Sequence, residues 1–218
     1  MDIEKGSQIS ALMLTDLNID GLSLARGERR LFKALSLGLS AGQAVALTGA
    51  NGAGKTSLLR AVAGFIRPEA GTIGFHDRGR TLDPREARAT GLHLLGHLDG
   101  LKGQRLAGDE LGFQARWLGA DRAAVDRAVA TLKLAPLLDL EVRKLSAGQR
   151  RRLALARLVA APRPLWLLDE PFAPLDARWR QAVGDLMQAH LDGGGLILAA
   201  VHDPLPIPAR PLDLGAFA

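Results

Sequence analysis

The residue types with the clearest chemistry stand together in one glycine-rich segment. It reads Gly49-Ala50-Asn51-Gly52-Ala53-Gly54-Lys55-Thr56. This order matches the pattern G-x-x-x-x-G-K-[ST] of a phosphate-binding loop (P-loop) at every required position. Glycine permits positive φ, so main-chain N–H groups can approach a β-phosphate, while Lys55 would reach the β- and γ-phosphates and the Thr56 hydroxyl would bind Mg²⁺. Together with Ser57, which follows, these residues predict a nucleotide site; the alternative is a chance glycine-rich turn.

Two carboxylates follow a second apolar segment, residues 165–168. Asp169 is predicted to hold Mg²⁺, directly or through water. Glu170 is predicted to polarise the attacking water as a general base, a role typically worth about 10² to 10⁴ in rate. An apolar run that ends in Asp-Glu is common, but after a complete P-loop it indicates the Walker B strand of a hydrolytic site.

A third motif, Leu145-Ser146-Ala147-Gly148-Gln149, lies between these two and opens a helical segment. The Ser146 hydroxyl and the first N–H groups of that helix would offer a second phosphate contact. Because one nucleotide has a single γ-phosphate, both contacts are satisfied most simply if the second comes from another copy of the chain. The alternative for Ser146 is an ordinary helix N-cap, and the run Arg150–Arg152 is interpreted as a solvent-exposed charged face.

These motifs need strands that end at one edge of a sheet. Residues 43–48 read as a buried parallel strand before the P-loop, and 57–65 as the helix after it. Residues 165–168 and 196–201 read as further buried strands, each followed by polar residues. Ligands of open parallel sheets bind at this carboxyl edge. The proline-rich tail after His202 is predicted to be irregular or extended.

The remaining segments are expected to flank this core. Residues 12–24 and 34–39 alternate in hydrophobicity, which indicates antiparallel strands. Residues 79–107 are rich in Gly, Arg and Asp and are predicted to be loop with short elements. From 108 to 145 the pattern is helical, with Asp121 as an expected N-cap. We interpret this region as a helical insertion between two halves of an α/β core.

The composition limits the remaining possibilities. The 218 residues, 47% of them hydrophobic, suffice for one domain with a sizeable core. The net charge of +5 suits nucleotides, nucleic acid or an anionic membrane without distinguishing among them. The absence of cysteine excludes disulfides, thiolate zinc sites and a cysteine nucleophile. Residues 1–5 lack the features of a signal peptide and no run approaches about 18 apolar residues, so we expect a cytoplasmic chain.

With these motifs in this order, the chain resembles the nucleotide-binding subunits of ABC transporters over nearly its full length. Residues 145–149 match their signature segment, Pro174-Leu175-Asp176 their D-loop, and His202 their switch histidine. The resemblance implies that Ser146, Gly148 and Gln149 act on the ATP of a second copy. It further implies that Asp176 links the two sites, that His202 senses the γ-phosphate, and that ATP and Mg²⁺ are bound.

The same resemblance implies a fold. It is an α/β P-loop NTPase with a RecA-like parallel-sheet core, an N-terminal antiparallel β subdomain and an inserted helical subdomain. Residues 1–218 would form a single ABC ATPase domain. Within it, 10–90 and 150–218 would be the catalytic core, and about 91–149 the helical subdomain.

Two positions depart from the general family pattern. His97 stands where the glutamine of the Q-loop is expected. The chain has no tyrosine to stack on adenine, so the planar guanidinium of Arg26 is predicted to take that place, with Phe32 as the alternative.

A narrower resemblance involves the segment 96–102, Gly-His-Leu-Asp-Gly-Leu-Lys. This segment, the compact length and the Asp-Glu-Pro-Phe at 169–172 are similar to the ATP-binding subunits of cytochrome c biogenesis, the CcmA or heme exporter ATPase family. That family's segment tends to read Gly-His-Gln-Pro-Gly-Ile-Lys. The resemblance implies a heme-transporting ATPase of the translocase class, peripheral on the cytoplasmic face of the bacterial inner membrane.

The partners implied are a second copy of the chain and integral membrane subunits of the cytochrome c biogenesis complex, with no nucleic acid. Leu98, Leu101 and Phe113 are candidate apolar contacts for the membrane subunits; the alternative is that they pack the helical subdomain. Two other functions stay open: the ATPase of another ABC transporter, and a soluble ABC-type ATPase that acts on nucleic acid or ribosomes.

Overall fold

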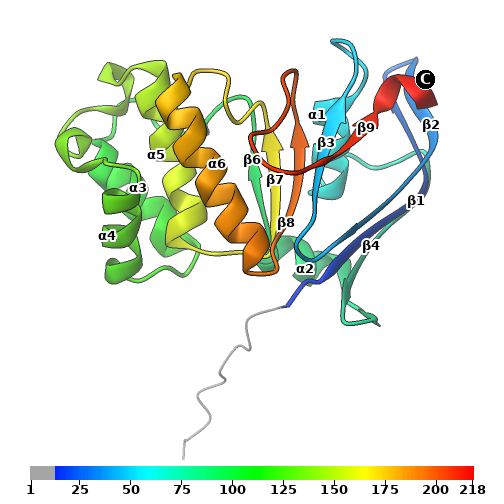
Figure 1. Cartoon of the computed structure of the whole chain (residues 1–218), viewed down its shortest axis with the longest axis horizontal. Helices are drawn as coiled ribbons and strands as arrows, with labels where there is room; N and C mark the ends of the chain where they lie inside the picture. The colour runs from blue at the N-terminus through cyan, green and yellow to red at the C-terminus, as the bar shows by residue number, and fades with distance from the viewer. Residues whose placement is uncertain (1–12) are drawn as a thin grey trace, which may run out of the picture.

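The computed structural model describes residues 13–218 (Figure 1). The first residue of the expected strand at 12, the expected start of the core at residue 10 and the segment 1–5 lie outside the described residues. Within the described part of the chain, no helix is both long and apolar enough to cross a membrane.

A five-stranded parallel sheet forms the centre of the molecule, in the order β6-β7-β8-β3-β9. Its strands are β3 (Ala44–Thr48), β6 (Leu92–Leu95), β7 (Leu165–Asp169), β8 (Leu196–Ala200) and β9 (Arg210–Asp213). The register pairs Leu47 with Ala200 and Asp169 with Ala200, so β3, β7 and β8 end at the same level. The loops that follow these three strands therefore meet at one edge.

An antiparallel sheet packs beside this core, in the order β2-β1-β4-β5. It comprises β1 (Asp16–Arg26), β2 (Arg29–Ser40), β4 (Ala70–Asp77) and β5 (Arg80–Thr81). Its inward-facing leucines share a hydrophobic cluster with one face of the parallel sheet, represented by Val45 and Leu47 of β3. The alternate residues of the same strand, Ala44 and Ala46, belong to the cluster on the other face. The expected parallel core and antiparallel β subdomain are both confirmed.

The helices divide into those that cover the core and those that project from it. They are α1 (Lys55–Val62), α2 (Pro84–Thr90), α3 (Ala107–Trp117), α4 (Arg122–Thr131), α5 (Ala147–Ala160) and α6 (Ala177–Asp192), with short 3-10 turns η1 (Ala135–Leu137), η2 (Val142–Lys144) and η3 (Leu214–Phe217). Figure 1 shows α3 and α4, drawn in green, beside α5 at the side of the molecule opposite the antiparallel sheet. The N-cap expected at Asp121 is confirmed, because its carboxylate accepts a 2.7 Å hydrogen bond from the Ala124 N–H.

Two strands form where the sequence patterns predicted something else. β6 lies inside the segment expected to be loop and helical subdomain, so the parallel core continues to Leu95 rather than stopping at residue 90. The buried His93 obscures its hydrophobic pattern. β9 forms in the tail expected to be irregular or extended, and it tolerates Pro211 because it lies at the edge of the sheet and pairs only with β3 among the described strands.

Candidate active site

The P-loop connects β3 to α1 and has the backbone conformation that its glycines permit. Gly49, Gly52 and Gly54 have φ values of 124°, 82° and 103°. Two of them are also tightly packed: a Cβ on Gly54 would lie 3.1 Å from the Phe32 ring, and one on Gly49 would lie 3.2 Å from Asp213 Oδ1. Gly54 is the N-cap of α1 and offers no capping side chain, so the first N–H groups of this helix are left for an anion or for water.

Lysine, threonine and aspartate side chains converge at this loop. Lys55 is 8% exposed, and its ammonium donates a 2.7 Å hydrogen bond to the Gly49 carbonyl oxygen. The Thr56 hydroxyl donates a 3.0 Å hydrogen bond to Asp169 Oδ2 across 113 residues of sequence. A hydroxyl and a carboxylate held side by side are the hard oxygen donors that Mg²⁺ prefers, so the residues present fit the predicted metal.

Glu170 follows directly in a strained conformation. Its φ of 49° lies in the left-handed region, which is costly for a residue other than glycine. Its N–H donates a 3.0 Å hydrogen bond to the Ala200 carbonyl oxygen, which ties the end of β7 to the end of β8. Its carboxylate lies 3.2 Å from the Nε2 of His202, the residue predicted to sense the γ-phosphate. The expected base and the expected sensor are therefore in contact.

A cavity of about 450 Å³ brings most of the predicted site together. Its lining consists of Arg26, Leu31, Ala50, Asn51, Gly52, Ala53, Gly54, Lys55, Thr56, Ser57, His97, Asp169, Glu170, Ala173 and His202. Arg26 is exposed on its wall. The alternative stacking residue is wrong: Phe32 is 0% exposed and packs behind Gly54.

The signature and D-loop residues lie outside this cavity. Ser146 caps α5 in a capping box, in which its hydroxyl accepts from the Gln149 N–H (3.2 Å) and the Gln149 amide oxygen accepts from the Ser146 N–H (2.8 Å). The N-cap interpretation of Ser146 is thus correct, and the residue is also exposed. A Cβ on Gly148 would lie 2.9 Å from the Pro174 carbonyl oxygen, so glycine allows the signature helix to approach the D-loop. Asp176 caps α6 by accepting from the Trp179 N–H at 2.9 Å.

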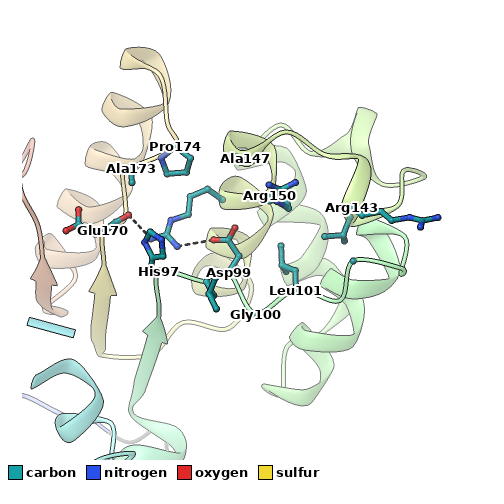
Figure 2. A pocket seen from close by; sticks show the side chains of 14 residues that line it. His97, Asp99, Gly100, Leu101, Arg143, Ala147, Arg150, Glu170, Ala173 and Pro174 are labelled. Carbon is teal, nitrogen blue, oxygen red and sulfur yellow. Dashed lines mark hydrogen bonds and ion pairs between the residues drawn. The ribbon is translucent and has the colours of Figure 1, made fainter. Parts of the chain in front are cut away.

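A larger cavity, of about 840 Å³, lies against the start of α5 and adjoins the cavity at the P-loop (Figure 2). Figure 2 shows His97 and Asp99 between Glu170 on one side and Leu101 on the other, with Pro174 above them. His97 and Glu170 line both cavities, so the loop at the Q-loop position reaches the cavity at the P-loop although it has no glutamine.

The interpretation of Arg150–Arg152 as a solvent-exposed face is wrong. Arg151 is 2% exposed and donates to main-chain oxygens at the end of β7. Arg150 donates to the Leu145 carbonyl oxygen at 2.6 Å, and Arg152 to the Leu132 carbonyl oxygen at 3.0 Å. One signal in the sequence could have identified the buried member, because Arg151 shares helical spacing i, i+3, i+4, i+7 with the buried residues Ala154, Leu155 and Leu158.

Comparisons with known proteins agree with this architecture. A family model described as ABC transporter matches residues 32–173. The cytochrome c biogenesis ATP-binding export protein CcmA of Rhodopseudomonas palustris (strain BisB5) is 48% identical over 198 residues, covering 91% of this chain and 97% of the relative. The protein of the same name from Nitrobacter winogradskyi is 44% identical over 202 residues, covering 93% and 99%.

Solved structures show the same fold. A putative ABC transporter ATP-binding protein from Pyrococcus furiosus superposes with a TM-score of 0.80 at 20% identity, covering 94% of this chain and all of that one. A bacterial Atm1-family ABC exporter with ATP bound superposes with a TM-score of 0.75 at 26% identity, covering 93% of this chain and 37% of the exporter. The chain belongs to the ABC transporter family and, within it, to the family of cytochrome c biogenesis ATP-binding export proteins CcmA.

Proposed function

We propose that this chain is the ATP-hydrolysing, energy-coupling subunit of a bacterial complex for c-type cytochrome biogenesis, where it drives heme export or release of a heme-loaded chaperone. The observation that carries the proposal is the near full-length identity of 48% to a protein named for that process, in a chain whose P-loop, Asp169, Glu170 and His202 line one cavity. The heme-transporting ATPase reaction of the translocase class is the finer form of the same proposal.

The residues divide the work of hydrolysis. The P-loop N–H groups and Lys55 hold the phosphates, and Thr56 and Asp169 supply the oxygens for Mg²⁺, which neutralises charge on the phosphates when bound. Glu170 polarises the attacking water, and His202, 3.2 Å from its carboxylate, responds to the γ-phosphate. Arg26 stacks on adenine at the wall of the cavity.

A second copy of the chain completes each site in this proposal. Ser146, Gly148 and Gln149 do not line the cavity that holds the P-loop. Ser146 is exposed at the start of α5, and in the proposed dimer it contacts the ATP of the partner subunit. Asp176, the N-cap of α6, follows two residues after Pro174, against which Gly148 packs, and in this proposal it links the two sites.

Membrane subunits are the other proposed partners, and they would hold the chain on the cytoplasmic face of the inner membrane. Exposed apolar side chains mark the surface of the helical part: Leu98 is 84% exposed, Trp117 81% and Phe113 46%. Phe113 and Trp117 line a hollow of about 310 Å³ together with Phe65, which follows α1 of the parallel-sheet core. Leu101, in contrast, is half-buried against the hydrophobic core, so the alternative that it packs the subdomain holds for this residue.

A strain that lacks this chain tests the proposal. We expect it to lose holocytochrome c, wild-type chain to restore it, and Lys55→Ala to fail because the phosphate contact is lost. Haem staining of periplasmic and membrane fractions measures the outcome. Normal holocytochrome c in the deletion strain would reject the cytochrome role and leave the ATPase of another ABC transporter as the function.

A further inference from the structure

A buried arginine joins the start of α5 to the hydrolytic end of β7. Arg151 is 2% exposed, and each N–H of its guanidinium has an acceptor. Nε donates to the Pro171 oxygen (3.1 Å), Nη1 to the Gly96 oxygen (2.9 Å) and Asp99 Oδ1 (3.0 Å), and Nη2 to the Asp169 oxygen (2.7 Å) and the Glu170 oxygen (2.9 Å). A guanidinium presents five donors in a fixed planar fork, and this site uses all five.

The acceptors belong to two segments that are far apart in sequence. Gly96 and Asp99 lie in the loop after β6 that carries His97, whereas the other three carbonyls lie where β7 ends. The dashed lines in Figure 2 mark two contacts of Arg151, one with Asp99 in the loop and one with Glu170 at the end of β7. Arg151 therefore links the loop to the main chain of Glu170.

The link constrains a strained residue. Glu170 has a φ of 49°, and its peptide groups are held on both sides: its N–H donates to the Ala200 oxygen, and its carbonyl accepts from Arg151. A left-handed non-glycine residue persists only where its surroundings determine it. The direction of the Glu170 side chain follows from that main-chain conformation.

Electrostatics make the link sensitive to the position of the loop. A buried cation is tolerated only with a counter-charge and satisfied hydrogen bonds, and Asp99 supplies the ion pair at 3.0 Å. If the loop moved away, Arg151 would lose both Asp99 and the Gly96 carbonyl. The position of the loop and the conformation of Glu170 are consequently coupled through one side chain.

We propose that Arg151 is a positioning residue for ATP hydrolysis, through which the loop at 96–102 sets the placement of the Glu170 carboxylate. Arg151 lines the larger cavity together with His97 and Asp99, but it does not line the nucleotide cavity. Arg151 therefore acts through Glu170 rather than on ATP. The inference rests on the proposed hydrolytic function and adds to it the means by which the loop at 96–102 controls the rate.

The test compares three variants in the assembled membrane complex: Arg151→Lys, Asp99→Ala and the double variant. Lysine keeps the charge but cannot form the fork, so we expect kcat to fall by about tenfold or more, while KM and Kd for ATP change by less than about twofold. Asp99→Ala should lower kcat several-fold, and the double variant should be no slower than Arg151→Lys alone. Arg152→Lys is the matched control, because Arg152 contacts Leu132 and Trp179 instead, and its kcat should equal that of wild type.

Several results would overturn the inference. A wild-type kcat in Arg151→Lys would do so. A loss of activity that is matched by a loss of ATP affinity or by a lower melting temperature would also do so, because an arginine with a purely structural role gives that pattern. If Arg151→Lys does not fold, Asp99→Ala decides alone, and an unchanged kcat rejects the coupling. A wild-type complex that hydrolyses no ATP would contradict the proposed function itself, which separates the two failures.

Discussion

At the scale of single residues, Glu170 has the most specific arrangement in the site. Its carboxylate contacts His202, and its main chain is fixed by Ala200 and Arg151. We expect Glu170→Gln to retain ATP binding, because the P-loop and Lys55 are untouched, and to lower turnover by about 10² or more, because an amide cannot accept the proton of the attacking water. Steady-state hydrolysis and nucleotide affinity of the complex measure this; turnover near the wild-type rate would assign the base elsewhere.

Single residues also show what sequence could and could not predict. The P-loop, Asp169 and Glu170 were found because their chemistry needs fixed types at fixed spacing, and the structure places them around one cavity. The contact of Thr56 with Asp169 spans 113 residues and exists only in the fold. The burial of Arg151 is hard to predict because three successive arginines are typical of a solvent-exposed face, whereas helical geometry turns only the middle one inward. The place of Phe32 is hard to predict because an aromatic side chain near a nucleotide site can equally belong to the core.

At the scale of elements, the junction of β6 with the end of α5 gives the protein a predictable dependence on pH. His93 of β6 is 4% exposed, and its Nε2 lies 2.6 Å from the Ala161 carbonyl oxygen. Burial lowers the pKa of His93 to about 3. Burial also lowers the pKa of His190, which stacks on Trp166 with ring centroids 3.9 Å apart. Both imidazoles are therefore neutral in the folded protein at neutral pH.

This arrangement predicts that the folded state weakens in mild acid. The unfolded chain binds a proton at His93 near pH 6.5, whereas the folded chain does so only near pH 3, so the stabilisation is complete above 6.5 and is lost progressively below it. The expected loss is about 1 kcal/mol per pH unit between 6 and 5. His93→Gln, whose amide can still donate to Ala161, should reduce this slope. Urea unfolding at several pH values measures it, and equal slopes in the two proteins would contradict the assignment.

Elements were predictable where a pattern was long or a motif marked its ends. β3, β7 and β8 read as continuous apolar runs because both of their faces are buried. β6 is not predictable because four residues that include a buried histidine carry no recognisable period. The pairing of β9 is not predictable because Pro211 argues against a strand, and only its position at the edge of the sheet makes it acceptable.

At the scale of the whole molecule, the separation of the signature from the nucleotide cavity predicts an assembly. With Mg-ATP and with hydrolysis blocked in Glu170→Gln, two copies should close into a two-fold dimer that holds two nucleotides, each between one P-loop and the partner's Ser146 segment. Ser146→Arg in the same background should prevent closure, because it places a bulky side chain at the contact. Light scattering with nucleotide quantification measures both species, and a chain that stays monomeric in the presence of its partners would argue against sites shared between copies.

We expect membrane subunits to cover the exposed apolar side chains Leu98 and Trp117. Leu98 and Trp117 are more than four-fifths exposed, and large apolar side chains in this state are stabilised by contact with a partner. Neither side chain contributes to the folded core, so Leu98→Asp and Trp117→Ala should leave the melting temperature and ATP affinity unchanged. Each change removes apolar contact area from the proposed interface, and Leu98→Asp also adds a charge to it.

We therefore expect both variants to leave the membrane fraction and to fail to restore holocytochrome c in the deletion strain. Leu140→Asp is the matched control, because Leu140 is 41% exposed but lines neither the larger cavity nor the hollow around Trp117. It should behave as wild type in both assays. Release of all three variants would indicate a general loss of solubility or folding, whereas retention of Leu98→Asp and Trp117→Ala in the membrane would move the partner's contact to another face of the chain.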